Sequence, residues 1–208
     1  GISQKPTGFK AVISSEEWLD DLFSAINERG LSSAPDFITL DGADGGTGAA
    51  PMSLMDDVGL PLKESLPMLI DKLNEHGLRD RIKVNASGKM VNPTEVSWAL
   101  CVGTDFVSTA RGPMFALGCI QALQCNQNTC PTGITTHDLD LQKGLDVKNK
   151  QVRVAHYLQN LEKEVRIIAN SCGLKRPREF NRSHARIMVG SGKSVTLDKL
   201  YPNVEQKH

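Results

Sequence analysis

The sequence predicts an α/β fold built on a parallel sheet, and three observations support this. Four short apolar runs recur along the chain, amphipathic helical patterns follow three of them, and 39% of the 208 residues are hydrophobic, which is enough for a packed core. Strands that alternate with helices pair in parallel through right-handed crossovers.

The first two predicted strands each lead toward a helix. The strand Phe9–Ile13 precedes Ser14–Glu17, which contains a Ser-x-x-Glu capping box, and Gly30 is well placed to end the helix that follows. The second strand, Phe37–Leu40, precedes a glycine-rich loop and then a helix that ends at Gly77.

The next two predicted strands lead to a capped helix and to a cysteine-bearing loop. The strand Ile82–Ala86 precedes Asn92–Glu95, which supplies an N-cap, a proline at the first helical position and a glutamate three residues after the cap. The fourth strand is Phe106–Ala110. A final helix is expected from about residue 152 to residue 169, and Gly173 ends it.

We expect residues 1–173 to form one domain and residues 174–208 a polar C-terminal tail. The arginines of the tail either dock a partner or, as we expect, present a solvated basic face. Four βα units make either an open, doubly wound sheet or the second half of an eightfold barrel. A four-stranded parallel piece leaves two sheet edges exposed, whereas barrel closure removes them. The chain starts at Gly1 without a methionine, which favours the half-barrel interpretation.

The composition argues against several classes of partner. Lys plus Arg and Asp plus Glu number 24 each, so no net field favours non-specific binding to nucleic acid or to an anionic membrane. No apolar run reaches the roughly 18 residues of a membrane span, and no basic segment leads into one as in a secretory signal. The cysteines number 5, an odd count that indicates thiols in a reducing compartment, and we expect a cytoplasmic protein.

A glycine-rich loop, Asp41–Pro51, follows the second predicted strand. Glycines let the backbone approach a ligand closely, and α/β active sites gather at the carboxyl ends of strands. A flexible surface loop is the alternative. The spacing matches neither Gly-x-Gly-x-x-Gly nor a nucleotide P-loop, which argues against both kinds of site. The binding candidates in this loop are Asp44, Gly45, Gly46, Thr47 and Gly48.

Two further loops end the third and fourth strands, and each carries a cation. In barrels such loops commonly bind phosphate through backbone amides. Lys10 stands inside an otherwise apolar strand, where it either points to solvent or lies at the barrel mouth and holds an anionic flavin or a substrate carboxylate. The candidates are Lys10, Ser87, Gly88, Lys89, Thr109, Ala110 and Arg111.

The most specific signal lies in residues 114–137, where three cysteines follow the pattern Cys-x5-Cys-x4-Cys and a proline follows the last. Three interpretations are open. The thiolates bind zinc with His137 as a fourth ligand, they bind an iron–sulfur cluster, or they are unrelated buried thiols. Zinc sites usually use closer cysteine pairs, whereas iron–sulfur ligands often precede a proline. Three cysteines without an evident fourth suit a cluster that lacks one iron.

These residues together resemble the FMN-binding domain of glutamate synthase and, more closely, the short stand-alone members of that family. The motifs that carry the resemblance are Asp44–Pro51, Val58–Pro61 and Leu117–Gly133, in that order, within a similarity that runs from Lys5 to about Gly173. The resemblance implies a (β/α)8 barrel, of which this chain supplies the last four βα units plus a C-terminal helix and tail.

The resemblance also implies two cofactors, FMN and a 3Fe-4S cluster. Cys119, Cys125 and Cys130 match the cluster ligands, Lys10 matches a lysine near flavin and substrate and is the catalytic candidate, and the loop candidates above match the FMN site. In the implied reaction, ammonia and 2-oxoglutarate form an imine that is reduced to glutamate, with electrons relayed through the cluster to FMN. The implied partners are an amino or 2-oxo acid substrate, an electron-donor protein or pyridine-nucleotide subunit, and the N-terminal half of the barrel.

Two classes of function therefore compete. The first is an FMN- and iron–sulfur-dependent oxidoreductase of the glutamate synthase type. The alternative is a truncated, non-catalytic iron–sulfur electron-transfer module, or a half-barrel fragment with free thiols that dimerises through its open sheet edges. Flavin bound in stoichiometric amount favours the first, and a cluster without flavin favours the second.

Overall fold

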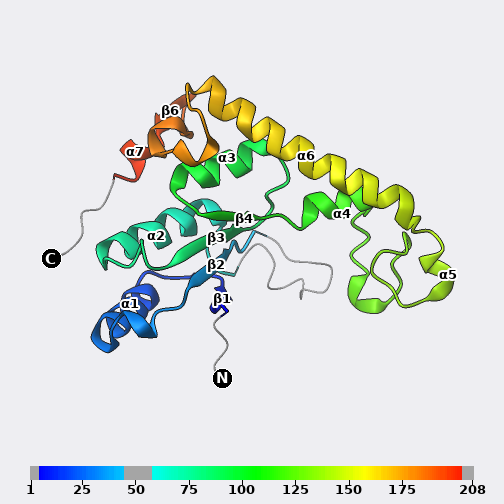
Figure 1. Cartoon of the computed structure of the whole chain (residues 1–208), viewed down its shortest axis with the longest axis horizontal. Helices are drawn as coiled ribbons and strands as arrows, with labels where there is room; N and C mark the ends of the chain where they lie inside the picture. The colour runs from blue at the N-terminus through cyan, green and yellow to red at the C-terminus, as the bar shows by residue number, and fades with distance from the viewer. Residues whose placement is uncertain (1–4, 45–57, 203–208) are drawn as a thin grey trace.

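The computed structural model describes residues 5–44 and 58–202, and its centre is a parallel sheet of four strands (Figure 1). The strands lie in the order β1-β2-β3-β4, so each one pairs with the next along the chain. This arrangement confirms the predicted α/β class and parallel pairing. The strands are β1 (Gly8–Ala11), β2 (Phe37–Asp41), β3 (Lys83–Ser87) and β4 (Phe106–Ser108).

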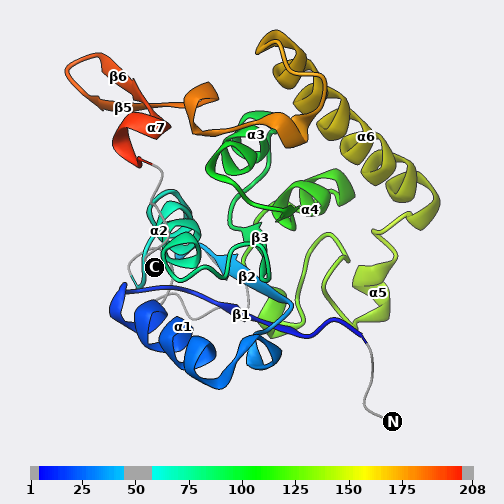
Figure 2. The same cartoon turned by 60° about the vertical axis from the view of Figure 1, so that its left-hand side comes forward.

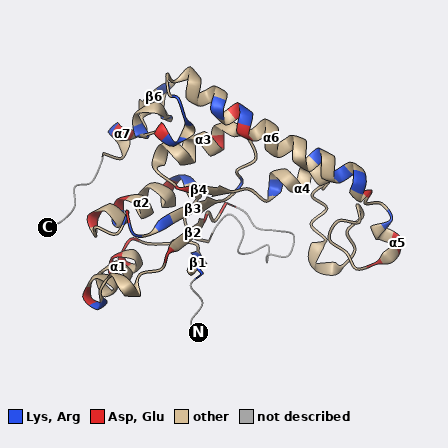
Figure 3. Ribbon diagram, viewed as in Figure 1, with Lys and Arg blue, Asp and Glu red and all other residues tan. Residues whose placement is uncertain are grey.

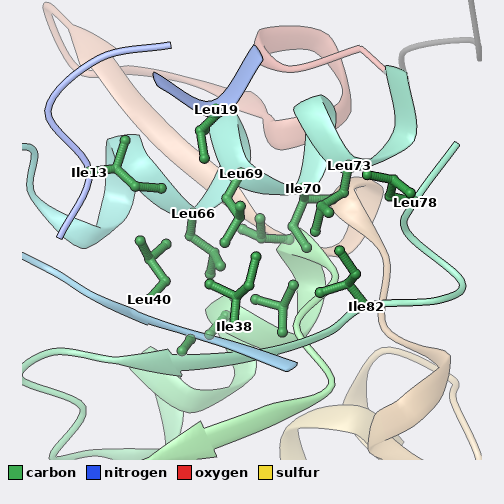
Figure 4. Packing of buried hydrophobic residues seen from close by; sticks show 14 of the residues in the cluster. Ile13, Leu19, Ile38, Leu40, Leu66, Leu69, Ile70, Leu73, Leu78 and Ile82 are labelled. Carbon is green, nitrogen blue, oxygen red and sulfur yellow. The ribbon is translucent and has the colours of Figure 1, made fainter. Parts of the chain in front are cut away.

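Each strand is followed by a helix, and three of these helices pack on one face of the sheet. Alternate strand residues point to that face, where Ile38 and Leu40 of β2 meet the leucines of α2, Leu66 and Leu69 among them (Figure 4). The helices are α1 (Glu17–Arg29), α2 (Leu62–Glu75), α3 (Pro93–Val102) and α4 (Arg111–Leu117), and a short 3-10 turn, η1 (Leu31–Ser33), follows α1.

The opposite face of the sheet is polar toward the carboxyl ends of the strands. Asn85 of β3 donates to the hydroxyls of Thr39 and Ser108, its neighbours on β2 and β4, at 3.3 and 2.9 Å. In the next row toward the carboxyl ends of the strands, Asp41, Ser87 and Ser108 pair across the sheet. The sheet therefore separates an apolar layer under the helices from a polar layer on the side where a barrel interior lies.

Helix starts show where local sequence signals decide the structure. The predicted cap of α3 is confirmed, since Asn92 accepts from the Glu95 backbone while the Glu95 side chain accepts from the Asn92 backbone. The predicted capping box at residues 14–17 is wrong, because α1 begins at Glu17 and its N-cap residue makes no side-chain cap. Ile13 is buried and accepts from Leu60, so residues 14–16 serve as the connection from the core to the helix.

The rest of the chain adds a long helix and a folded tail. Helix α6 (Val147–Ser171) is longer than the predicted 152–169 and lies against α3 and α4. The remaining elements are η3 (Cys125–Gln127), α5 (Leu139–Gln142), η4 (Pro177–Glu179), η5 (Arg182–His184), β5 (Arg186–Gly190), β6 (Lys193–Thr196) and α7 (Leu197–Leu200).

The tail is not simply a solvated basic segment, as its composition suggested. Strands β5 and β6 form an antiparallel hairpin. Figure 2 shows the segment before the hairpin beside α3, and α7 beside α2. Leu197 is fully buried in the main core. The Arg182 side chain is 7% exposed, pairs with Asp71 of α2 at 2.6 Å and donates to the Tyr201 carbonyl at 2.9 Å. Burial raises the pKa of Asp71, and the hydrogen bond from Arg182 opposes that shift.

Charges of both signs are spread over the molecule (Figure 3). Helix α2 carries lysines among its carboxylates, whereas the charged residues of α1 are acidic except for Arg29. Among the described residues, no helix has the length and apolar character needed to cross a bilayer.

Candidate functional site

A cavity of about 450 Å³ lies at the carboxyl end of the sheet. Its walls come from the ends of β1 and β2, the loops after β3 and β4, helix α4 and the loop that carries the three cysteines. Sites for small molecules and cofactors typically measure about 300–1,000 Å³. Nine predicted site residues line this cavity: Lys10, Ser87, Gly88, Lys89, Ala110, Arg111, Cys119, Cys125 and Cys130.

The first wall is an ion pair that connects neighbouring strands. Lys10 Nζ lies 2.5 Å from Asp41 Oδ2, and both side chains face the cavity. Lys10 therefore lines the cavity while its side chain is 59% exposed, so its predicted role in holding a flavin or a substrate stays a prediction. Sequence reasoning missed Asp41 as a site residue. The signal was its position at the end of an alternating strand, on the same face as Thr39.

The second wall is the turn after β3, where the backbones of two loops approach closely. Gly88 has φ +141°, and a Cβ added there would lie 3.2 Å from the Gly42 nitrogen. Gly42 in turn donates to the Ser87 carbonyl at 2.9 Å. A side chain at position 88 would thus strain the backbone and crowd the preceding loop. Lys89 follows with φ +47° and lines the cavity.

The third wall is the turn from β4 into α4. Ala110 and Arg111 line the cavity, whereas Thr109 does not. The Thr109 hydroxyl is buried and, within the described part of the chain, has no hydrogen-bond partner. Helix α4 packs closely against α6 at Gly112. A Cβ at this position would lie 1.9 Å from the Tyr157 hydroxyl of α6, so the close packing requires glycine. That hydroxyl donates to the Val91 carbonyl at 2.7 Å.

The glycine-rich loop falls largely outside the described residues. Gly45, Gly46, Thr47 and Gly48 belong to that part, so their predicted contact with a cofactor stays a prediction. Asp44 is described, and its Oδ1 accepts from the Leu62 backbone at the start of α2, at 3.1 Å. This contact fixes the point where the chain enters α2.

The fourth wall is the cysteine loop, residues 118–138, which polar side chains hold in shape. Asn128 has φ +63°, and its side chain accepts from the His137 backbone at 2.6 Å. The Thr136 hydroxyl donates to the Asn128 carbonyl at 2.6 Å, and Gln142 of α5 donates to the Thr136 carbonyl at 2.7 Å. These contacts hold the second half of the loop in shape, and Cys119, Cys125 and Cys130 all line the same cavity.

The three thiols differ in their surroundings. Cys130 is buried, Cys119 and Cys125 are half-buried, and all three are free. Burial works against a Cys130 thiolate, but hydrogen bonds from Thr132 and Thr135 outweigh it and lower the pKa of Cys130 to about 6. In contrast, burial raises the pKa of Cys101, which lies outside the cavity, to about 12.

The thiols share a cavity but do not form a closed metal site. Among the described residues, no group of three or more His, Cys, Asp or Glu side chains is close enough to hold a metal ion. His137, the fourth ligand of the zinc alternative, is exposed and is not among the residues that line the cavity. The donor set, three thiols on one wall, suits iron–sulfur chemistry better than a site of mixed ligands.

The same cavity suits a phosphorylated flavin. Two cations follow β3 and β4, the position where barrels commonly bind phosphate. The apolar part of the lining, which includes Met90, Met114 and Ile134, suits a flat ring system.

Comparison with known proteins gives the family. Residues 14–175 match the family described as a conserved region in glutamate synthase. The glutamate synthase large subunit-like protein YerD of Bacillus subtilis is 43% identical over 199 residues, which is 96% of this chain and 38% of that protein. The archaeal glutamate synthase [NADPH] of Methanocaldococcus jannaschii is 34% identical over 143 residues, 69% of this chain and 28% of that protein.

Solved structures give the fold. A double mutant of flavocytochrome b2 with pyruvate bound aligns with a TM-score of 0.51 and 16% identity, over 86% of this chain and 34% of that one. This likeness supports the partial barrel. The chain spans 38% of the Bacillus relative and 28% of the Methanocaldococcus one. With the family match over most of its length, the chain belongs to the glutamate synthase family.

Proposed function

We propose that this chain supplies part of the catalytic barrel of an FMN-dependent oxidoreductase that reductively aminates a 2-oxo acid, as in the conversion of 2-oxoglutarate to glutamate. The observation that carries the proposal is the single cavity into which the sheet, two phosphate-type loops and the cysteine loop all project. The family match supports the same class of chemistry.

In this proposal the loops after β3 and β4 hold FMN. Lys89 and Arg111 supply positive charge for its phosphate, and the backbone at Ser87 and Gly88 can approach the phosphate closely. Bound FMN supplies hydride transfer. The protein orients the substrate and, through its apolar lining, excludes water from the reacting groups.

Cys119, Cys125 and Cys130 hold a 3Fe-4S cluster in this proposal. This assignment is supported by the type of donor, three free thiols, and by the cavity that the three residues share. The three thiols must approach one another to close on a metal, so we expect the cysteine loop to rearrange when iron and sulfide bind.

The remaining partners follow from the length of the relatives and from the sheet. Strands β1 and β4 lie at the two edges of the four-stranded sheet, and unpaired edges are covered in native proteins. We propose that the N-terminal half of the barrel covers them. An electron-donor protein or a pyridine-nucleotide subunit supplies the electrons, and a cytoplasmic setting suits the free thiols.

The test uses the full-length protein, purified without oxygen and assayed for bound FMN. The flavin is then reduced with dithionite and mixed with ammonium and a panel of 2-oxo acids. We expect reoxidation that requires both substrates. A protein without flavin, or a reduced flavin that no member of the panel reoxidises, contradicts the proposal.

A matched pair of variants tests the proposed phosphate loop. Arg111→Gln should lower the flavin content, because it removes a cation from the cavity. Arg166→Gln is the control, since Arg166 lies exposed on α6 and pairs with Glu162. Equal flavin content in the two variants contradicts the proposed role of Arg111.

A further inference from the structure

We infer that the hydroxyls of Thr132 and Thr135 donate hydrogen bonds to the Cys130 sulfur when it is a ligand of the iron–sulfur cluster, and that they thereby raise the reduction potential of the cluster. The inference rests on the proposed function, because it concerns the cluster placed there on the three cysteines. The two threonines are positioning residues, since they act on the electron transfer through Cys130 and not on the substrate.

A tight turn sets Thr132 beside the Cys130 thiol. Residues 130–133 read Cys-Pro-Thr-Gly, and the Gly133 amide donates to the Cys130 carbonyl at 3.1 Å. Proline at the second position and glycine at the fourth are favoured in the commonest type of β-turn. Gly133 has φ +72°, and a Cβ there would lie 2.3 Å from the Leu141 carbonyl oxygen of α5. The turn is therefore packed against α5, and within it the Thr132 hydroxyl lies 3.3 Å from the Cys130 sulfur.

The direction of this hydrogen bond follows from the chemistry of a ligand thiolate. Between a free thiol and a hydroxyl, either atom can be the donor. A cysteine that binds iron in a cluster does so as a thiolate, which has lost its proton and can only accept. With iron bound, the Thr132 hydroxyl is therefore the donor.

Thr135 supplies a second hydroxyl on the same wall. It lines the cavity together with Thr132 and Cys130. Its hydroxyl is buried and, among the described residues, has no oxygen or nitrogen partner, so the Cys130 sulfur is the acceptor within its reach. Both threonines also contribute to the lowered pKa of Cys130, which indicates that they favour negative charge on this sulfur.

Cys130 is the thiol on which such donors act most strongly. It is 8% exposed, whereas Cys119 and Cys125 are half-buried. Cys119 accepts from the Gln121 backbone amide at 3.5 Å, a long contact. A hydrogen bond is electrostatically stronger in an enclosed environment than in contact with water. Control of the potential is therefore concentrated at Cys130.

The sign of the effect follows from the charge that reduction adds. One electron comes from the donor protein or pyridine-nucleotide subunit of the proposed function, is held by the cluster and its thiolates, and passes on to FMN. Donors directed at a ligand sulfur stabilise the more negative, reduced state, so they raise the potential. Both threonines lie within residues 130–135 and move with Cys130 when the cysteine loop closes on the metal.

The test measures the midpoint potential of the cluster in the full-length protein, purified without oxygen. The protein is titrated with dithionite, and the cluster is followed by electron paramagnetic resonance. Thr132→Val and Thr135→Val keep the shape of the side chain and remove the hydroxyl. Each should lower the ratio of reduced to oxidised cluster at a fixed potential by about tenfold, which is a fall of about 59 mV for one electron. Thr132→Ser keeps the hydroxyl and should retain the potential of the unchanged protein.

Thr129→Val is the matched control. Thr129 directly precedes Cys130 in the same loop, but its hydroxyl donates to the Gln124 side chain at 3.2 Å and not to the sulfur. The same substitution at this position should therefore leave the potential unchanged. Iron, acid-labile sulfide and FMN are measured on the same samples.

The outcomes separate this inference from the proposed function. A cluster that is present in every variant at one common potential overturns the inference and leaves the proposed function in place. A Thr132→Val protein that loses its iron also overturns it, since the hydroxyl would then be needed to hold the ligand. A full-length protein that binds FMN but no iron overturns the cluster and this inference with it. A protein without FMN whose cluster potential still falls in Thr132→Val contradicts the proposed reaction and supports the role of the threonines.

Discussion

The helix-covered face of the sheet and the cysteine loop are held together by different forces. Under the helices, Phe23, Leu66 and Leu73 are fully buried, and the contacts are apolar. In the cysteine loop, residues 118–138, most side chains are exposed or half-buried, and the contacts are polar hydrogen bonds centred on Asn128 and Thr136.

This difference assigns separate tasks to the two regions. Apolar burial contributes most of the free energy of folding, so the sheet and its helices form a stable scaffold that positions the strand ends. A loop held by a few polar contacts opens at lower free energy than the core. The cysteine loop is therefore the part of the site that can change shape around a ligand.

The largest expected effect comes from the scaffold. Phe23→Ala removes a fully buried ring of α1 and should lower the free energy of unfolding by about 3–5 kcal/mol. Leu139→Ala, at a side chain 75% exposed beyond the cysteine loop, should change it by less than about 0.5 kcal/mol. Urea unfolding followed by circular dichroism measures both, and equal effects would contradict the division into two regions.

The tail belongs with the scaffold in this comparison. Arg182→Ala leaves Asp71 buried without its partner and should cost about 3 kcal/mol of unfolding free energy. Arg176→Ala is the control, because Arg176 is 78% exposed and pairs with Glu179 on the surface, where such pairs contribute at most about 1 kcal/mol. A loss for Arg182→Ala no larger than that of the control would place the tail outside the cooperative unit.

A change within the cysteine loop should act locally. Asn128→Ala removes the acceptor of the His137 amide and leaves a left-handed backbone without a residue that tolerates it, at a local cost of about 1–3 kcal/mol. Hydrogen exchange should show loss of protection at His137 while the amides of β2 are unchanged. Asn128→Asp keeps the acceptor oxygen and should retain the protection. Loss of protection throughout the sheet would contradict a local effect.

The smallest expected effect on the free energy of unfolding is pH-dependent and comes from the contact of Asp20 on α1 with Lys72 of α2. Hydrogen bonds from Lys72 and His76 lower the pKa of Asp20. The stabilisation from the Asp20 carboxylate is therefore complete above the ordinary pKa of this carboxyl in the unfolded chain, 3.8. It is lost as pH falls through the lower pKa that Asp20 has in the folded state. Since Asp20 is 41% exposed, we expect less than about 1 kcal/mol.

Unfolding in urea between pH 3 and 6 measures this contribution. Asp20→Asn should flatten the acid side of the profile, whereas Asp21→Asn, at an exposed position of the same helix, should leave it as it is. Identical profiles for both variants would show that the pair with Lys72 contributes nothing.

Much of the fold could be predicted from the sequence, because local signals determine it. The four strands, the cap at Asn92 and the glycines after α1 and α6 are local features, and the structure bears them out. The folded tail was missed because its contacts are distant in sequence. Arg182 pairs with Asp71 across 111 residues, and Leu197 packs into a core whose other buried members all lie before residue 103.

The site was predicted in part for the same reason. Strand ends and the cysteine spacing indicated which residues face the cavity, and nine of them do. The pairing of Lys10 with Asp41 depends on the register between two strands, which a pattern along one strand does not encode. The burial of the Thr109 hydroxyl likewise follows from packing.

The most direct test of this account is the iron and acid-labile sulfide content of the full-length protein and of four cysteine variants, purified without oxygen. We predict about three irons and four sulfides per chain for the unchanged protein and for Cys172→Ser, whose thiol is exposed near the end of α6. Cys119→Ser, Cys125→Ser and Cys130→Ser should each lose the cluster. Iron content that these three substitutions leave unchanged, or a full-length protein that holds no iron, would contradict the assignment of the cysteine loop.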